Sequence, residues 1–290
     1  MPRIAAIATV ATLCRMVKIE HSVFALPFAF MGLFAAHGGW PPLSEALLLA
    51  LGMVCIRSFA MTFNRIVDVY YDSLNPRTAT RPLVTGELSR THAWIFCGIT
   101  ALGFVLSTVY MNRLCLMLSP VALFVAAFYS YTKRFTWLCH VVLGLMLAMA
   151  PMAGWLCAIP HFTLPPMLLA AGVLFWVAGF DIFYACQDVD FDTRYDLHSA
   201  PVHFGIPTAL ILAAFCHVNT VIFFFLAGIG FAFDWPWYAT LAAIAALLCW
   251  EHALVKPDDL SRVNMAFFVL NGCISVALFL GLFASIFMGK

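Results

Sequence analysis

The sequence predicts an all-α integral membrane protein with about nine transmembrane helices. Three observations lead to this fold class: the composition, the length of the apolar runs and the uneven distribution of basic residues between them. The chain has 290 residues, of which 64% are hydrophobic and 10% are charged, and its mean hydropathy is +0.97. Because a soluble domain carries about 25% charged residues, a lipid bilayer must cover much of this surface.

Nine apolar runs approach the roughly 20 residues that a helix needs to cross a bilayer. We expect a single domain over residues 1–290, with a short interfacial helix over residues 1–13 and no removed signal peptide. The predicted spans are residues 21–36, 47–67, 92–111, 114–131, 137–159, 164–186, 207–231, 237–250 and 265–288.

The connections between these spans alternate in charge. One set is charged and mostly long: residues 68–90, 133–134, 188–203 and 251–262. Of the fifteen Lys and Arg, only Arg113 and Lys290 fall on the other side, and Arg57 lies within a span. Since Lys and Arg accumulate in the cytoplasm, we expect the charged loops and the N-terminus there and the C-terminus outside, in a cell inner (plasma) membrane.

Charge and cysteine usage exclude several classes of function. The net charge of +1 and the lack of a basic stripe exclude a nucleic-acid partner. The ten cysteines are scattered through apolar runs, and no two of them have CxxC spacing. This pattern argues against a zinc site or a disulfide framework, and favours small apolar side chains that pack.

Two acidic segments follow the second and sixth spans, at the same side of the membrane. In the first, Asn64, Asp68 and Asp72 are four residues apart and share one face of a helix. In the second, the same spacing relates three aspartates, Asp188, Asp192 and Asp196. Oxygen ligands of this kind suit Mg²⁺. Two facing carboxylate rows would repel each other unless cations lay between them.

The parallel between the two segments extends deeper into the membrane. Arg57 precedes Asn64 by seven residues, and Asp181 precedes Asp188 by seven. Seven residues make two helical turns, so each charge lies about 10 Å further in on the same face. A lone charge there costs about 3 kcal/mol. We expect both to line one polar cavity as a pair, and the alternative is a buried ion pair with no substrate role.

Basic side chains cluster beside the same two segments. They are Arg77 and Arg81 after the first, Lys133 and Arg134 at the end of the fourth span, and Arg194 and His198 after the second. Cations beside a magnesium–carboxylate site suit a diphosphate, whose negative charge grows as it leaves. For Arg90, Arg134 and Lys256, the general accumulation of basic residues in cytoplasmic loops explains the charge as well as a role in substrate binding does.

Together these motifs resemble the UbiA family of membrane prenyltransferases. The resemblance covers essentially the whole chain. It rests on Asn64-x-x-x-Asp68-x-x-x-Asp72, on Asp188-x-x-x-Asp192, on Tyr129-x-x-x-Lys133 between them, and on residues 77–83. It implies nine helices around a central cavity capped by cytoplasmic loops, and transfer of a prenyl chain from a polyprenyl diphosphate to an acceptor, usually an aromatic ring.

The resemblance also implies roles for single residues. Mg²⁺ and the diphosphate would be held by the five motif positions, Asn64, Asp68, Asp72, Asp188 and Asp192. Arg77, Arg81 and Lys133 would contact phosphate or acceptor, and Tyr129 would lie near the ionising carbon. Arg57, Asp181, Arg194 and His198 are further candidates for substrate binding.

The acceptor remains open between two aromatic acids. Residues 19–27 and the triplet Leu197-His198-Ser199 are similar to the 4-hydroxybenzoate polyprenyltransferase-like branch. That branch implies 4-hydroxybenzoate or a dihydroxynaphthoate-type acid, in ubiquinone or menaquinone synthesis. Arg65 and Val69 depart from the pattern of some aromatic-acid enzymes, which leaves the acceptor undecided.

Two other functions compete with this one. A transporter or channel would spread charges along several spans to both faces, whereas here the acidic residues cluster on one side and few charges lie on the other. A haem- or chlorophyll-prenylating enzyme of the same fold stays open, although residues 77–83 and 19–27 favour quinones. Chain length, oligomeric state and the proton-accepting base are not readable from the sequence.

Overall fold

The computed structural model is a bundle of long α-helices joined by short connections and by two longer helical loops. It describes residues 11–17 and 26–288, and within these residues no β-strand is present. Residues 11–16 are helical, so the predicted interfacial helix is seen only at its end, and residues 1–10 lie outside the described part. All ten cysteines are free thiols in the structure.

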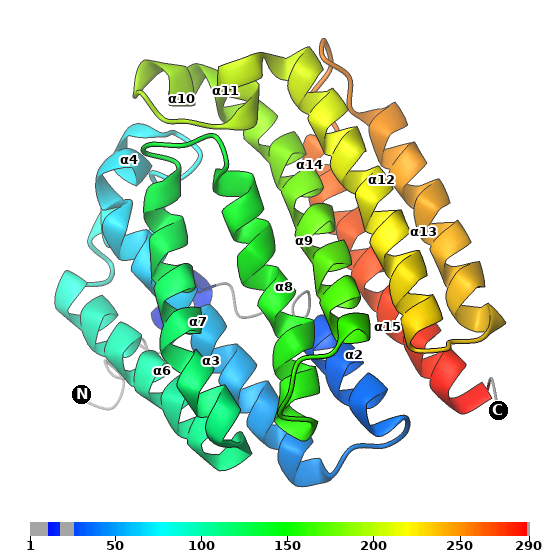
Figure 1. Ribbon diagram of the computed structural model, residues 1–290. Helices are drawn as coiled ribbons and strands as arrows, with labels where there is room; N and C mark the ends of the chain where they lie inside the picture. Colours follow the sequence, from blue (N-terminus) through cyan, green and yellow to red (C-terminus); the bar gives the residue numbers. More distant parts are fainter. Residues whose placement is uncertain (1–10, 18–25, 289–290) are drawn as a thin grey trace.

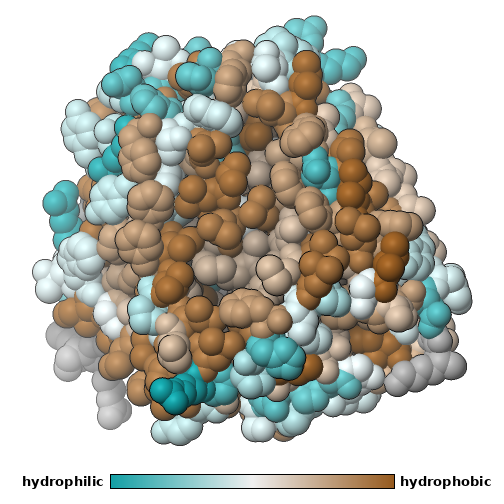
Figure 2. Space-filling model, in the orientation of Figure 1, coloured by the Kyte–Doolittle hydropathy of each residue, from teal (hydrophilic) through white to brown (hydrophobic). Residues whose placement is uncertain are grey.

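Eight of the described helical segments are long and apolar enough to cross a membrane. They are formed by α3 (Leu43–Val67), α6 (Arg90–Met111), α7 (Arg113–Thr132), α8 (Cys139–Ala158), α9 (Leu164–Ala185) with its extension, α12 (Ile206–Gly230), α13 (Trp235–Leu254) and the segment that ends with α15 (Asn271–Met288). The protein is therefore a multi-pass membrane protein. Figure 2 shows one face on which hydrophobic residues cover the middle of the helices and hydrophilic residues gather towards their ends.

The first predicted span is shorter than expected in the described residues. Helix α2 covers Leu26–His37, which is 12 residues, and residues 21–25 of that span lie outside the described part. The helix packs against α8 and α15 in the main hydrophobic core. The count of nine spans therefore stays a prediction, with eight established by length.

The crossing of α2 and α8 is unusually close because glycines face backbone there. A Cβ on Gly32 would lie 1.9 Å from the carbonyl oxygen of Pro151, and one on Gly154 would lie 1.9 Å from that of Ala29. Small residues at such positions let membrane helices approach through van der Waals contact. The crossing holds α2 against α8 in the main hydrophobic core.

The eighth span is longer than the sequence indicated. The predicted span covers residues 237–250, but α13 continues to Leu254 with Glu251 fully buried. The side-chain amide of Asn271 donates to Glu251 Oε1 at 3.2 Å, and Trp176 Nε1 donates to Asn271 Oδ1 at 2.7 Å. One oxygen of this buried carboxyl group is therefore satisfied by hydrogen bonding, while Oε2 has no hydrogen-bond partner among the described residues. Spacing along the chain does not reveal such partners.

The two long charged loops form short helices at one end of the bundle. The first contains α4 (Val69–Leu74) and α5 (Pro82–Thr85), and the second contains α10 (Val189–Arg194) and α11 (Ala200–Phe204). In Figure 1, α4, α10 and α11 lie together over the ends of α3, α7, α8 and α9. The remaining short elements are α14 (Val263–Met265) and the π-helical turn Ala266–Leu270, which lead into α15.

Candidate active site

The first acidic segment lies at a break between two helices. Helix α3 ends at Val67, and Asp68 has φ −94° and ψ 6° before α4 begins at Val69. The sequence predicted one continuous helix face, but the break turns the chain between the first and second aspartate. Asn64 keeps its place beside Asp68, because its Nδ2 donates to Asp68 Oδ2 at 2.8 Å.

The second acidic segment has a similar break at its first aspartate. Helix α9 ends at Ala185, a 3₁₀ turn covers Cys186–Asp188, and α10 follows. Asp188 has φ −103° and ψ 6°, close to the values at Asp68. Helix α10 ends at Arg194, and Asp196 lies beyond it with φ +53°. The expectation that Asp196 shares a helix face with Asp188 and Asp192 is therefore wrong.

Each of the four motif aspartates is paired with a basic side chain of the protein. The pairs are Asp68–Arg134 at 2.9 Å, Asp72–Arg81, Asp188–Arg77 at 2.7 Å and Asp192–Lys133 at 2.7 Å. Charge-assisted bonds of this kind are among the strongest hydrogen bonds in proteins. Basic side chains of the chain therefore balance the charge of all four carboxylates.

Three of these four pairs link segments that are far apart in the sequence, and the pair made by Arg77 is one of them. Arg77 follows the first motif but binds the second: its Nη2 and Nε donate to the two carboxylate oxygens of Asp188 at 2.7 and 3.3 Å. Its Nη1 donates to the hydroxyl oxygen of Tyr184 at 2.8 Å. This two-pronged geometry fixes orientation as well as charge. The first loop is therefore held directly over the second motif.

Lys133 and Arg134 connect the end of α7 to both motifs. Lys133 Nζ binds Asp192, while Arg134 Nη2 donates to Asp68 Oδ1 at 2.9 Å and to the carbonyl oxygen of Val67 at 3.0 Å. The guanidinium of Arg134 also lies over the rings of Tyr71 and Tyr131, at 5.3 and 5.2 Å. Two adjacent residues thus link one aspartate of the first motif to one aspartate of the second.

Burial affects the ionisation of the groups just outside the spans. Burial raises the pKa of Asp68 above its ordinary value, although the hydrogen bond from Arg134 opposes this shift. Burial lowers the pKa of Lys133, but the Asp192 carboxylate more than compensates, so that the net pKa is raised and the ammonium stays charged. Shifted pKa values with a specific charged partner, as at Asp68 and Lys133, are common at functional sites.

Comparison with known proteins identifies the family and the fold. Residues 25–273 match the UbiA prenyltransferase family. The chain belongs to the UbiA prenyltransferase family. It is 32% identical over 244 residues to a 4-hydroxybenzoate octaprenyltransferase of Actinobacillus pleuropneumoniae serotype 5b, with 83% of each chain covered. It is 28% identical over 254 residues to the enzyme of that name from Methylobacillus flagellatus, with 88% of this chain and 85% of that one covered.

Solved UbiA structures have the same fold. The apo structure of a UbiA homologue from Aeropyrum pernix K1 superposes with a TM-score of 0.83 at 32% identity, covering 92% of this chain and 98% of that one. A UbiA homologue from Archaeoglobus fulgidus, bound to GPP and Mg²⁺, superposes with a TM-score of 0.75 at 23% identity, covering 95% and 99%. The protein is thus a UbiA-type prenyltransferase in family and in fold.

The acidic cluster offers oxygen ligands of the kind that Mg²⁺ prefers. Asp192 is 1% exposed, and its Oδ1 is buried without a hydrogen-bond partner, although Lys133 and Ser199 contact the other oxygen. A buried orphaned carboxylate oxygen fits a cation ligand. Within the described residues no three Asp, Glu, His or Cys side chains converge on one metal position, so a metal ion would also need substrate or water oxygens.

The deeper residues Arg57 and Asp181 have separate partners. Asp181 Oδ2 lies 2.7 Å from His140 Nδ1, and His140 Nε2 accepts the backbone N–H of Ala200 at 3.1 Å. Arg57 Nη1 donates to the carbonyl oxygen of Val17 at 3.1 Å. The expected pair is therefore not formed between them: Asp181 joins α9 to α8, whereas Arg57 joins α3 to the N-terminal helix.

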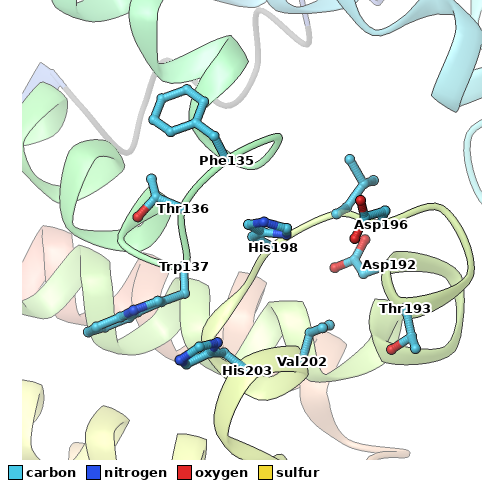
Figure 3. Close-up of a pocket in the computed structure, with 10 residues that line it drawn as sticks. Phe135, Thr136, Trp137, Asp192, Thr193, Asp196, His198, Val202 and His203 are labelled. Carbon is cyan, nitrogen blue, oxygen red and sulfur yellow. The ribbon is translucent and has the colours of Figure 1, made fainter.

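The remaining predicted residues lie around the cluster with different exposure. Tyr129 is half-buried on α7, one turn before Lys133, and Arg194 is exposed at the end of α10. His198 lies in the middle of a pocket of about 620 Å³, opposite Asp192 and Asp196, as Figure 3 shows. The α7–α8 loop, including Trp137, forms its other wall. Arg194 does not line this pocket and takes part in none of the four pairs.

Sequence reasoning missed three members of the site. Arg134 was weighed equally against ordinary cytoplasmic charge, yet it holds Asp68. Tyr184 precedes Asp188 by four residues, as Asn64 precedes Asp68, and this spacing could have revealed it. His140 lies in an apolar helix. Because a polar side chain among hydrophobic residues needs a hydrogen-bond partner, its position in that helix could have indicated one.

Proposed function

We propose that the protein transfers a polyprenyl chain from a polyprenyl diphosphate to an aromatic acid, in a reaction that depends on Mg²⁺. One observation carries this proposal: four aspartates, each held by a basic side chain, form one cluster at the end of the bundle. The cluster contains both the ligands for a metal ion and the cations for a diphosphate. The relatives named 4-hydroxybenzoate octaprenyltransferase favour 4-hydroxybenzoate over a dihydroxynaphthoate acceptor.

The paired side chains have a second set of partners in this reaction. When a diphosphate binds, Arg77, Arg81 and Lys133 turn from the carboxylates towards phosphate oxygens. This would leave oxygens of Asp72, Asp188 and Asp192 available to hold Mg²⁺, together with Asp68, which Arg134 and Asn64 hold in place. Bound Mg²⁺ supplies charge neutralisation for the leaving diphosphate. Basic groups aimed at the same oxygens stabilise the charge that develops there.

The apolar body of the protein protects the reactive carbon. An allylic cation reacts with any water that reaches it, so the chain has to bind where water is excluded. We assign Tyr129 to the neighbourhood of that carbon, because it lies on α7 one turn before Lys133. His198 and Arg194 remain candidates for contact with the acid, and Arg57 and Asp181 remain candidates for the deeper cavity wall.

The proposed topology rests on the distribution of Lys and Arg between the loops. We propose a single domain over residues 1–290, whose charged loops, cluster and N-terminus lie in the cytoplasm. The C-terminus then lies outside an inner (plasma) membrane, if α2 with the residues before it makes a ninth crossing. A place in ubiquinone synthesis follows from 4-hydroxybenzoate as the acceptor, and a place in menaquinone synthesis would follow from the naphthoate.

The test is a transfer assay on the purified protein. Radiolabelled octaprenyl diphosphate is incubated with a panel of aromatic acids, with Mg²⁺ or with EDTA, using wild type and Asp68→Asn. We expect metal-dependent labelling of one acid by wild type only. A transporter, the second candidate, predicts no labelled product from any acid and no stabilisation of the folded protein by the diphosphate.

A further inference from the structure

Asp181 and His140 form a polar pair just inside the end of the bundle that carries the acidic cluster. Asp181 lies four residues before the end of α9, and His140 is the second residue of α8. Tyr129 lies at a similar depth on α7, three residues before its end. Helices α7 and α9 both pack against α8, and in Figure 1 these ends lie together near α4 and α10. The pair is therefore at the depth to which we assign the reacting carbon.

Two hydrogen bonds fix the protonation state of the imidazole. A backbone N–H can only donate, and that of Ala200 lies 3.1 Å from His140 Nε2. Nε2 therefore carries no hydrogen, and the neutral ring has its proton on Nδ1. Nδ1 lies 2.7 Å from Asp181 Oδ2, so it donates to the carboxylate. Because both ring nitrogens are in use, His140 cannot take up a proton without losing the bond from Ala200.

The carboxylate of Asp181, in contrast, keeps one oxygen open. His140 holds Oδ2, whereas Oδ1 has no hydrogen-bond partner among the residues that the structure describes. The side chain of Asp181 is 17% exposed, compared with 4% for His140. A carboxylate with one oriented oxygen and one open oxygen can take up a proton without disturbing its support. In this pair the acceptor of a proton is therefore Asp181.

The neutral partner distinguishes Asp181 from the four motif aspartates. Each of those is paired with an Arg or Lys side chain, and a carboxylate beside a cation is a weaker base than one beside a neutral donor. Tyr129 lies within electrostatic range of both Asp181 and Asp68. The region around Tyr129 is thus close to the acidic cluster, which binds charge, and to a carboxylate that remains free to accept a proton.

We propose that Asp181, positioned by His140, accepts the proton that the aromatic ring loses when it gains the prenyl chain. The inference rests on the proposed function and assigns the base of that reaction. The C–O bond of the prenyl diphosphate breaks, its electron pair leaves with the diphosphate, and a ring carbon bonds to the allylic carbon. The proton of that ring carbon then passes to Asp181 Oδ1, and the electron pair of the C–H bond returns to the ring.

A deuterium isotope effect tests this role. The aromatic acid that wild type prenylates is prepared with hydrogen or with deuterium at the ring position that gains the chain. Single turnovers with the protein in excess exclude product release from the measured rate. We expect Asp181→Asn to transfer the chain about a hundredfold more slowly than wild type, with a larger isotope effect, because removal of the ring proton becomes the slow step. Both acids are measured on one preparation, so a loss of folded protein cancels in the ratio.

Lys133→Arg provides the control, since it slows an earlier step. Weaker contact with the diphosphate delays cleavage of the C–O bond, which precedes removal of the proton. We therefore expect this variant to be slower than wild type with an unchanged isotope effect. The inference is overturned if Asp181→Asn transfers at the wild-type rate, or if it is slower without a larger isotope effect, as expected for a purely structural ion pair.

Two variants of His140 test its part as a positioning residue. His140→Asn keeps a side-chain N–H that can donate to Asp181, whereas His140→Leu removes it. We expect the isotope effect to rise in His140→Leu and to stay near that of wild type in His140→Asn. Equal isotope effects in the two variants would contradict the positioning role. Failure of the proposed function gives a different result, since wild type would then prenylate no acid at all.

Discussion

The backbone N–H of His198 donates to the carbonyl oxygen of Lys133 at 2.7 Å, which ties the loop after α10 to the end of α7. The same lysine binds Asp192 through its ammonium group at 2.7 Å. Backbone and side chain of one residue thus fasten two loops that are far apart in the sequence. The loops at this end of the bundle are therefore expected to respond together when Lys133 is changed.

Replacing Lys133 should affect both stability and catalysis. Lys133→Gln leaves the buried Asp192 carboxylate without its cation, which we expect to cost about 3 kcal/mol of unfolding free energy. The rate of prenyl transfer should fall at least a hundredfold, which corresponds to about 2.7 kcal/mol in the activation free energy. The reason is that no ammonium group then neutralises the charge on the diphosphate. Lys133→Arg should recover most of the stability and part of the rate. Equal activity of Lys133→Gln and wild type would contradict the role of Lys133.

Two neighbouring aspartates on α10 form a matched pair for testing the cluster. Asp192 is buried beside Lys133, whereas Asp190 is exposed and takes part in none of the four pairs. We expect Asp192→Asn to abolish Mg²⁺-dependent transfer and Asp190→Asn to leave it within about twofold of wild type, since exposed charges contribute little. Steady-state assays over a range of Mg²⁺ concentrations measure this. Comparable losses in both variants would argue against a specific metal ligand.

Charge reversal distinguishes the observed partner of Asp181 from the expected one. Asp181→Asn weakens the bond to His140, and we expect it to lower the unfolding free energy by about 1–3 kcal/mol. The double reversal of Arg57→Asp with Asp181→Arg should restore nothing, because Asp181 binds His140 rather than Arg57. Thermal unfolding in detergent compares the single and double variants. Recovery in the double variant would mean that Arg57 and Asp181 do form a pair.

The close crossing of α2 and α8 predicts opposite results for one substitution at two glycines. Gly154→Ala would place a Cβ 1.9 Å from the carbonyl oxygen of Ala29. The helices must separate, at a cost of about 1–3 kcal/mol. Gly98→Ala meets no atom within 4 Å and lies on the exposed side of α6, so it should be neutral or stabilise by about 0.5–1 kcal/mol. Melting temperatures of both variants provide the measurement, and equal shifts would contradict the steric argument.

Patterns along the chain predicted the helices and the residue types of the site. Apolar runs long enough to cross a bilayer gave spans whose ends agree closely with α6, α7 and α9, because burial in lipid constrains length directly. The four-residue spacing of Asp68 and Asp72, and of Asp188 and Asp192, predicted that each pair would lie near the end of a span. The span boundaries and the positions of the aspartates both depend on residues that are close to one another in the sequence.

Features that depend on distant partners were not predictable in this way. Arg77 pairs with Asp188, and Asp181 pairs with His140. Each pair joins elements that are distant in the sequence, and residue spacing within one segment does not show that these elements pack together. The burial of Glu251 depends on Asn271 in another helix. The break at Asp68 was also missed, since aspartate is compatible with either a helical or a turn backbone there.

The backbone turns at Asp68 and Asp188 have nearly the same dihedral angles, each at the first aspartate after a long helix. Four residues before each turn the side chains differ: Asn64 stands in one segment and Tyr184 in the other. The chain thus uses one structural device twice, with different chemistry at the matching position. An internal duplication of a helical hairpin, followed by divergence of the two copies, would produce such a repeated turn. Aligning the two halves of the sequence with each other tests whether they share a common origin.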